Sequence, residues 1–125
     1  MNDKTFLHRQ IHPMHIQNGR VTSQAFSPMP KDGKRLSVDD GDLVSPEESY
    51  EIFINNGFCS IGVYSVTCQE CKKLELEVQN APVENNPNHA VIDFSSLQSN
   101  SHIKHTASKL RDLADKRGWT FRASK

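Results

Sequence analysis

Short apolar runs separated by polar segments predict most of the strands of this chain. The run Thr5–Ile11 predicts a first strand, which ends at His12 because the residue before a proline avoids helical backbone angles. After the Asn18–Gly19 turn signal, Arg20–Phe26 alternates between two faces and predicts a second strand. Further strands are predicted at residues 36–38, 62–66, 74–78 and 90–94, and an irregular loop at residues 27–33.

Two helices are predicted from their start signals and their apolar spacing. Ser45 can cap a helix with Pro46 at its first position and Glu48 closing a capping box, and Gly57 is placed to end it. A second capping box, Thr67–Glu70, predicts one or two helical turns. Near the end of the chain, one apolar stripe predicts a longer helix that ends at Gly118, and it consists of Ile103, Ala107, Leu110 and Ala114.

The order of these elements predicts the fold class. Strands, a helix, two strands around a short helical turn, another strand and a helix indicate an α+β fold with a mainly antiparallel, curved sheet and two helices. A length of 125 residues is typical of one domain, so we expect residues 1–125 to form a single domain.

Charge is balanced over the whole chain but not along it. The 15 Lys and Arg residues match the 15 Asp and Glu residues, which gives the molecule no overall preference for nucleic acid. The last helix is nevertheless basic and is followed by Trp119 and Phe121, a pattern that also suits stacking on nucleic acid. The same cations suit the negative end of a helix, so both interpretations stay open. This basic patch consists of Lys104, Lys109, Arg111, Lys116 and Arg117.

The expected location is the cytoplasm, without a membrane partner. The first residues lack the apolar core of a signal peptide, and no stretch approaches the roughly 18 apolar residues of a membrane span. Three cysteines, an odd number, indicate free thiols in a reducing compartment.

The spacing Cys68-x-x-Cys71 is compatible with two kinds of chemistry. A thiol at a helix start can serve redox catalysis, and a zinc site could combine this pair with Cys59 and His89. A single Cys-x-x-Cys pair is a weak signal for either. We therefore expect no metal and no disulfide, with Cys59 and Cys71 as small buried residues and Cys68 facing solvent.

The most promising ligand-binding residues lie near the start of the chain. Neighbouring strands could bring Arg9, Ser23 and Gln24 onto one surface, where the guanidinium suits phosphate or carboxylate. His8 and the more distant His89 complete this candidate set. His8 and His12, at the end of the first predicted strand, could also pair their imidazoles to bind a metal or transfer protons.

Several segments resemble a class of small uncharacterised bacterial proteins. They are Leu7–Arg9, Gly19–Phe26, Leu36–Val38, Gly62–Tyr64 and Asn86–Ile92. This resemblance covers most of the chain and brings no known activity with it.

A second resemblance is to ADP-ribosyltransferase-like domains of the RES type, and it rests on the first two strands and on the segment from Gly62 to Leu76. It implies that Arg9 or His8 binds NAD and that Ser23 fills the small polar position of the next strand. The third-motif glutamate of that family is not identifiable, since Glu75 and Glu77 lack its surroundings.

Three functions follow from these observations. The main expectation is a small accessory protein that binds a protein partner and has neither catalysis nor a cofactor, because the motifs of the large nucleotide-binding and hydrolase classes do not occur. The alternative is an ADP-ribosyltransferase-like domain that binds NAD, with His8, Arg9 and Ser23 in its site. The third is nucleic-acid binding through the basic patch.

Overall fold

The structure is a computed structural model that describes residues 1–123, and these residues confirm an α+β fold. Six strands form an antiparallel sheet in the order β6-β7-β4-β1-β5-β8, and two short strands form a hairpin. The sheet strands are β1 (Phe6–Gln10), β4 (Arg35–Asp40), β5 (Gly62–Thr67), β6 (Glu77–Asn80), β7 (His89–Asp93) and β8 (Phe121–Arg122). The remaining elements are the hairpin strands β2 (Ile16–Gln17) and β3 (Arg20–Val21), the 3-10 helices η1 (Pro13–His15), η2 (Ser23–Phe26) and η3 (Pro30–Asp32), and the helices α1 (Pro46–Asn55), α2 (Cys68–Lys73) and α3 (Asn100–Arg117).

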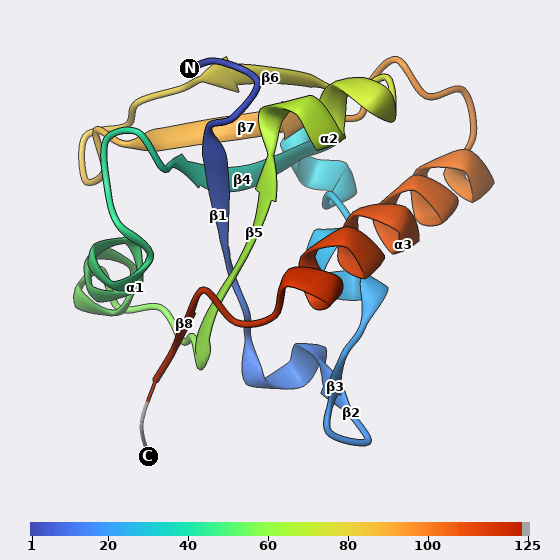
Figure 1. Cartoon of the computed structure of the whole chain (residues 1–125). Coiled ribbons are helices and arrows are strands. Elements are labelled where there is room, and N and C mark those ends of the chain that lie inside the picture. The colour runs from blue at the N-terminus through green and yellow to red at the C-terminus, as the bar shows by residue number, and fades with distance from the viewer. Residues whose placement is uncertain (124–125) are drawn as a thin grey trace.

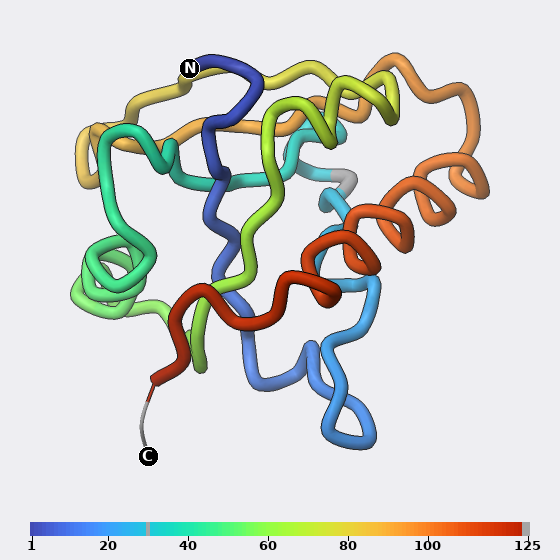
Figure 2. The backbone as a smooth tube through the Cα atoms, in the orientation of Figure 1, coloured from blue at the N-terminus to red at the C-terminus, as the bar shows by residue number. Residues whose placement is uncertain are grey.

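The sheet is strongly curved, as predicted, and it opens between two of its central strands. In Figure 1, β6, β7 and β4 run across the molecule, whereas β1 and β5 cross their direction; Figure 2 shows the same crossing in the backbone. β1 pairs with β5 along its whole length but with β4 only at Leu7–Asp40 and His8–Asp39. Beyond His8 the two strands separate.

The main core lies between the sheet and α3. The apolar stripe of α3 is buried as predicted, and η2 packs beside it against β1. Among the largest buried side chains are Leu7, Ile11, Phe26, Leu36, Ile92, Phe94 and Leu110.

The opposite face of the sheet carries α1, and the contact between them is polar. Ser49 of α1 is fully buried and donates to the Oδ2 atom of Asp39 on β4 over 2.6 Å. Gln10 of β1 donates to the Ser49 hydroxyl over 2.8 Å. The helix begins with the predicted capping box of Ser45 and Glu48.

The predicted strand at residues 20–26 is wrong beyond Val21. The Asn18–Gly19 turn does join two strands, with positive φ values of 53° and 76°, but Ser23–Phe26 forms η2. Both Ala25 and Phe26 are fully buried. A strand would place these consecutive side chains on opposite faces, whereas a helical turn brings both to α3.

The predicted strand at residues 74–78 begins later than its alternating pattern suggests. Leu74 ends α2, Glu75 turns with a φ of 64°, and the strand starts at Glu77. Leu74, at the end of α2, and Leu76, just before β6, both pack on the core. The alternating pattern of residues 74–78 therefore covers a turn followed by the start of a strand.

The segment after α3 folds back on the sheet. Trp119 packs edge-on against Tyr64 with ring centroids 4.7 Å apart, and Phe121 begins β8 beside β5. Within residues 1–123, no helix is long and apolar enough to cross a membrane.

Candidate ligand-binding cleft

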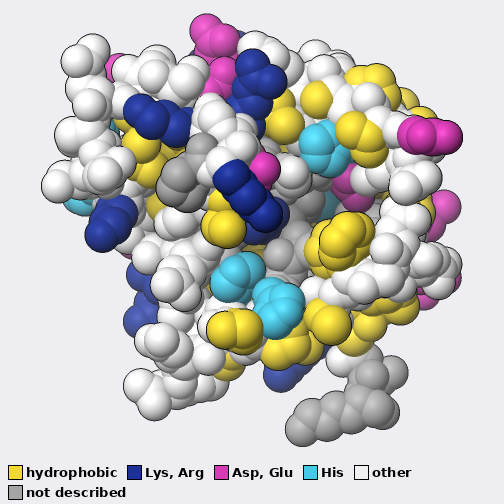
Figure 3. Space-filling model, turned by 180° about the vertical axis from the view of Figure 1, so that it is seen from behind, with side chains coloured by type: hydrophobic (Ala, Val, Ile, Leu, Met, Phe, Trp, Pro, Cys, Tyr) yellow, Lys and Arg dark blue, Asp and Glu magenta, His cyan; other side chains and the backbone are white. Residues whose placement is uncertain are grey.

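A cleft of about 900 Å³ opens where β1 and β4 separate. This volume lies in the range of small-molecule sites. Figure 3 shows the molecule from behind, with histidine and hydrophobic side chains gathered on the same face. The walls come from β1, η1, η3, the end of α1 and the loop before β7; they include Arg9, His12, His15, Lys31, Asp32, Phe53, Asn56, Phe58, Asn85, Asn86 and His89.

A second, smaller space of about 70 Å³, the inner chamber, shares part of its lining with the cleft. Consecutive residues of both separating strands line it, at positions 8–10 and 37–39, together with Phe53, Asn86 and His89. Because Arg9, Phe53, Asn86 and His89 line both spaces, we treat them as one site.

Arg9 bridges the opening between the strands. Its Nε atom donates to the carbonyl oxygen of Ala25 over 2.6 Å, and its Nη1 atom donates to that of Ser37 over 3.0 Å. Burial lowers the pKa of Arg9 to about 10, opposed by the nearby carboxylate of Asp32, so the guanidinium stays charged at neutral pH. No carboxylate of residues 1–123 lies within ion-pair distance of it. With five N–H donors, Arg9 therefore offers charge and donors to an anion.

His12 and His15 form a pair on η1 whose proton positions are fixed by the backbone. The Nδ1 atom of His12 accepts from the Met14 N–H, and the Nδ1 atom of His15 accepts from the His12 N–H. Each neutral ring must therefore carry its proton on Nε2. Burial, together with the charges of Arg9 and His12, lowers the pKa of His15 to about 4, so His15 is a neutral donor at pH 7.

His89 has the opposite proton arrangement. Its Nδ1 atom lies 2.8 Å from the carbonyl oxygen of Ala81. A carbonyl oxygen can only accept, so Nδ1 carries the proton and Nε2 of the neutral ring is a free acceptor. His89 begins β7 and is paired in register with Asp39 of β4.

An aromatic platform stands at the mouth of the cleft. Phe53 and Phe58 stack with ring centroids 5.0 Å apart and an interplanar angle of 27°. The side chain of Phe58 is 58% exposed, so its outer face is open to a ligand. Beside it, the Asn56 side-chain amide donates to the Asn85 carbonyl oxygen over 3.2 Å, which joins the end of α1 to the loop before β7.

The predicted site residue His8, on β1, is buried and does not line the main cleft. Its Nε2 atom lies 3.2 Å from the Val44 carbonyl oxygen, so it donates there, and its Nδ1 atom accepts from the Ser65 hydroxyl over 2.8 Å. Burial lowers the pKa of His8, although the Val44 carbonyl and the carboxylates of Asp39 and Asp40 act in the other direction. His8 contributes to the inner chamber as part of strand β1.

Ser23 and Gln24 do not join Arg9 in the cleft. Both belong to η2, and Gln24 lines a separate groove of about 380 Å³ beside α3. The physical reason is the helical turn, which directs the carbonyl of Ala25, and not a serine or glutamine side chain, to Arg9.

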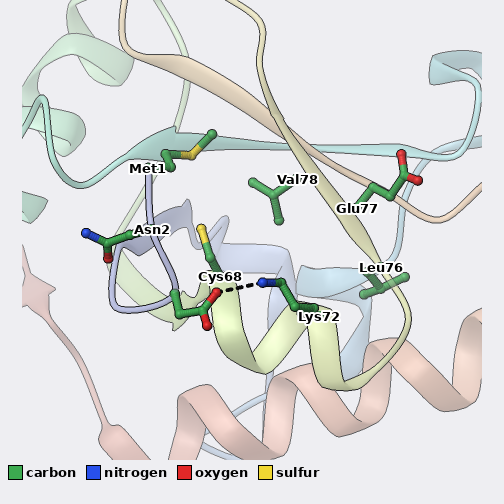
Figure 4. A pocket seen from close by; sticks show the side chains of 8 residues that line it. Met1, Asn2, Cys68, Lys72, Leu76, Glu77 and Val78 are labelled. Carbon is green, nitrogen blue, oxygen red and sulfur yellow. Dashed lines mark hydrogen bonds and ion pairs between the residues drawn. The ribbon is translucent and has the colours of Figure 1, made fainter.

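The cysteines occupy two different regions. Cys59 lines the cleft and is exposed, so its expected burial is wrong, whereas Cys71 is fully buried as expected. Cys68 is half-buried and lines a pocket of about 370 Å³, where Lys72 pairs with Asp3 over 2.8 Å (Figure 4). Figure 4 shows Leu76 and Val78 across this pocket from Cys68. Over residues 1–123, no three potential ligands among His, Cys, Asp and Glu come together in metal-binding geometry.

Part of the basic patch on α3 is used within the fold. Arg117 forms an ion pair with Glu70 at 3.1 Å and stands over the Phe6 ring, and Arg111 donates to the Val21 carbonyl oxygen over 3.1 Å. Lys104, Lys109 and Lys116 are exposed. Trp119 and Phe121, for which stacking on nucleic acid was one of the two interpretations, pack against Tyr64 and Tyr50.

Several cleft residues were not predicted from the sequence. Phe58 and Asn56 follow the end of α1, and Asn86 lies in a loop with two prolines, so no periodic pattern marks them. One signal in the sequence is Phe58, an aromatic residue directly after Gly57, the residue expected to end the helix. A large apolar side chain in a turn can mark an interaction surface. No protein-family model matches the chain, and neither the curated proteins nor the solved structures gave a match.

Proposed function

We propose that the protein binds a nucleotide-type ligand in this cleft, with NAD as one member of the class. The main observation in support is the Arg9 guanidinium, which donates to the backbone carbonyls of Ala25 in η2 and Ser37 in β4. It has no carboxylate partner among the described residues. A phosphate there would accept charge-assisted hydrogen bonds from the remaining donors. The Nε2–H groups of His12 and His15 add neutral donors along this wall, and the cation of Lys31 balances the carboxylate of its neighbour Asp32.

The other wall suits a planar ring. Stacking of a base on an exposed aromatic side chain contributes about 1–3 kcal/mol. Phe58, backed by Phe53, offers such a face. The side-chain amides of Asn56 and Asn85, which also line the cleft, provide both donors and acceptors for the edges of a base.

The proposal is binding and does not include group transfer. Glu77 lies on β6 beside the pocket of Cys68, and Glu75 is exposed in the turn before it. Neither lines the cleft, so the arrangement offers no glutamate for ADP-ribosyl transfer. A ligand-binding accessory protein is consistent with this geometry.

Calorimetry with ADP and with NAD tests the proposal. We expect a dissociation constant below about 1 mM for the wild-type protein and a loss of at least tenfold in Arg9→Lys, because lysine keeps the charge but not the forked donors. Arg20→Lys is the matched control, since Arg20 is exposed and does not line the cleft. No heat with either ligand, or equal affinity in Arg9→Lys, contradicts the proposal.

A second candidate function is protein binding at the rim of the same cleft. Met29, Phe58 and Val83 are large apolar side chains that are more than half exposed and line its mouth, and Met14 lies exposed on η1 nearby. Clustered exposed apolar groups are typical of interaction surfaces. Pull-down with wild type and with Val83→Ser tests it, with Leu43→Ser as the control for loss of an exposed apolar side chain elsewhere.

A further inference from the structure

The hydrogen bonds of four histidines divide them into two classes. His8, His12 and His15 carry the proton of the neutral ring on Nε2, because a hydroxyl or a backbone N–H donates to each Nδ1. His89 is the exception among these four, since its Nδ1 donates to the Ala81 carbonyl. The cleft therefore contains one imidazole acceptor among its donors.

The position of His89 determines what this acceptor can meet. His89 and Arg9 both line the inner chamber, whose volume of about 70 Å³ has room for roughly two water molecules. A group of this size that enters the chamber contacts both side chains. Asp39 also lines this chamber, and its two carboxylate oxygens already accept hydrogen bonds from Ser49 and Asn86. An anionic oxygen bound to Arg9 has no attraction to the lone pair on Nε2 of His89, so a ligand atom that meets Nε2 must carry a hydrogen.

We infer that His89 selects ligands with a hydroxyl group next to their anionic group and accepts a hydrogen bond from that hydroxyl through Nε2. This inference rests on the proposed function and specifies the ligand as a ribonucleotide. Its phosphate lies at Arg9, a ribose hydroxyl donates to His89, and its base lies toward Phe58. Nucleotides without ribose hydroxyls leave Nε2 unpaired and bind more weakly.

The variant His89→Asn isolates the Nε2 atom. The asparagine Nδ2 atom occupies the place of the histidine Nδ1 atom, so it keeps a donor for the Ala81 carbonyl while the acceptor is removed. His102→Asn is the matched control, because His102 is exposed on α3 and does not line the cleft. Thermal unfolding of each variant reports whether the fold is kept.

The experiment compares 5′-AMP with 2′,3′-dideoxy-AMP by calorimetry. We expect the wild-type protein and His102→Asn to prefer AMP by roughly three- to tenfold, the range of one hydrogen bond. His89→Asn binds both ligands equally, with the affinity that the wild type shows for the dideoxy form. That retained affinity demonstrates a folded site.

Each other outcome rejects a defined claim. If the wild type binds both nucleotides equally, the inference about His89 is wrong while the proposed function stands. If His89→Asn keeps the preference for AMP, another group reads the hydroxyl and the inference is again wrong. If the wild type binds neither nucleotide, the proposed function and the inference fail together.

Discussion

Arg9 and Ser37 face each other across the opening of the sheet, and a 3.0 Å hydrogen bond from the Nη1 atom of Arg9 to the Ser37 carbonyl oxygen spans it. Register pairing between β1 and β4 has already ended at His8–Asp39. The arginine side chain therefore replaces the missing backbone ladder and, at the same place, lines the cleft with its cation.

The first prediction concerns this bridge. Arg9→Ala removes the donors of two backbone carbonyls, so we expect the free energy of unfolding to fall by roughly 1–3 kcal/mol. Urea unfolding measures the change. Arg20→Ala, at an exposed arginine, changes it by no more than about 0.5 kcal/mol. Equal effects of the two substitutions would show that the bridge contributes nothing.

The second prediction concerns the polar contact below α1. Ser49→Ala removes the hydroxyl that donates over 2.6 Å to the buried carboxylate of Asp39. The other oxygen of this carboxylate keeps its hydrogen bond from the Asn86 amide. We expect a loss of roughly 1–3 kcal/mol. Ser101→Ala, an exposed serine of α3, is the control and should be nearly neutral. A neutral Ser49→Ala contradicts this account of the interface.

The third prediction concerns the aromatic platform. Phe58→Ala removes the stacking face and should weaken binding of ADP by roughly 5- to 100-fold, which corresponds to about 1–3 kcal/mol. Leu43→Ala is a matched control, since Leu43 is 59% exposed, against 58% for Phe58, and lies outside the cleft. Unchanged affinity of Phe58→Ala for ADP would show that the base does not stack on Phe58.

The fourth prediction concerns stability in acid. Burial lowers the pKa of His15 to about 4 and also lowers that of His8. The unfolded chain takes up protons near the ordinary histidine pKa of about 6.5, whereas the folded protein resists them. The free energy of unfolding therefore falls as the pH decreases below about 6.5, by at most about 1.4 kcal/mol per pH unit for each group.

The variant His15→Gln tests the origin of this slope. Between about pH 6.5 and pH 4, the unfolding free energy of His15→Gln should depend less on pH than that of the wild type, whatever its absolute value. His102→Gln, at an exposed position of α3, should keep the wild-type slope. A wild-type slope in His15→Gln would mean that other groups cause the acid sensitivity.

The fifth prediction concerns thiol reactivity. Cys59 is exposed, whereas burial raises the pKa of both Cys68 and Cys71, most strongly for Cys71. Alkylation followed by mass spectrometry should therefore modify Cys59 first, Cys68 more slowly and Cys71 only on unfolding. Reaction of Cys71 in the native protein at the rate of Cys68 would contradict the packing of α2.

Local signals in the sequence predicted the parts of the fold that local interactions determine. The capping box of Ser45 and Glu48 needs only four residues, and the stripe that includes Ile103 and Ala107 needs only a helical period. The strand expected at residues 20–26 failed because contacts with α3, distant in sequence, favour a helical turn there.

The candidate site could be predicted only in part, because residues far apart in the sequence form it. Arg9 and His89 were both predicted as ligand-binding residues, and the structure places both in the wall of the inner chamber. The crossing of β1 over β4 determines which other groups join them. No alternation within one strand carries that information, so the sequence did not predict Phe58 and Asn86 in this cleft, and Ser23, expected on one surface with Arg9, does not line it.

The most direct test of the proposed cleft is a two-dimensional ¹H–¹⁵N NMR titration of the labelled protein with ADP. Binding in the cleft should shift the amide signals of residues 8–10, 12, 14, 15, 37–39, 56–59, 85, 86, 88 and 89, while signals from the exposed side of α3 stay in place. Saturation of these shifts in wild type, together with their loss in Arg9→Lys, is the predicted result. No shifts at millimolar ADP, or shifts confined to α3 and its lysines, would contradict a nucleotide site between β1 and β4.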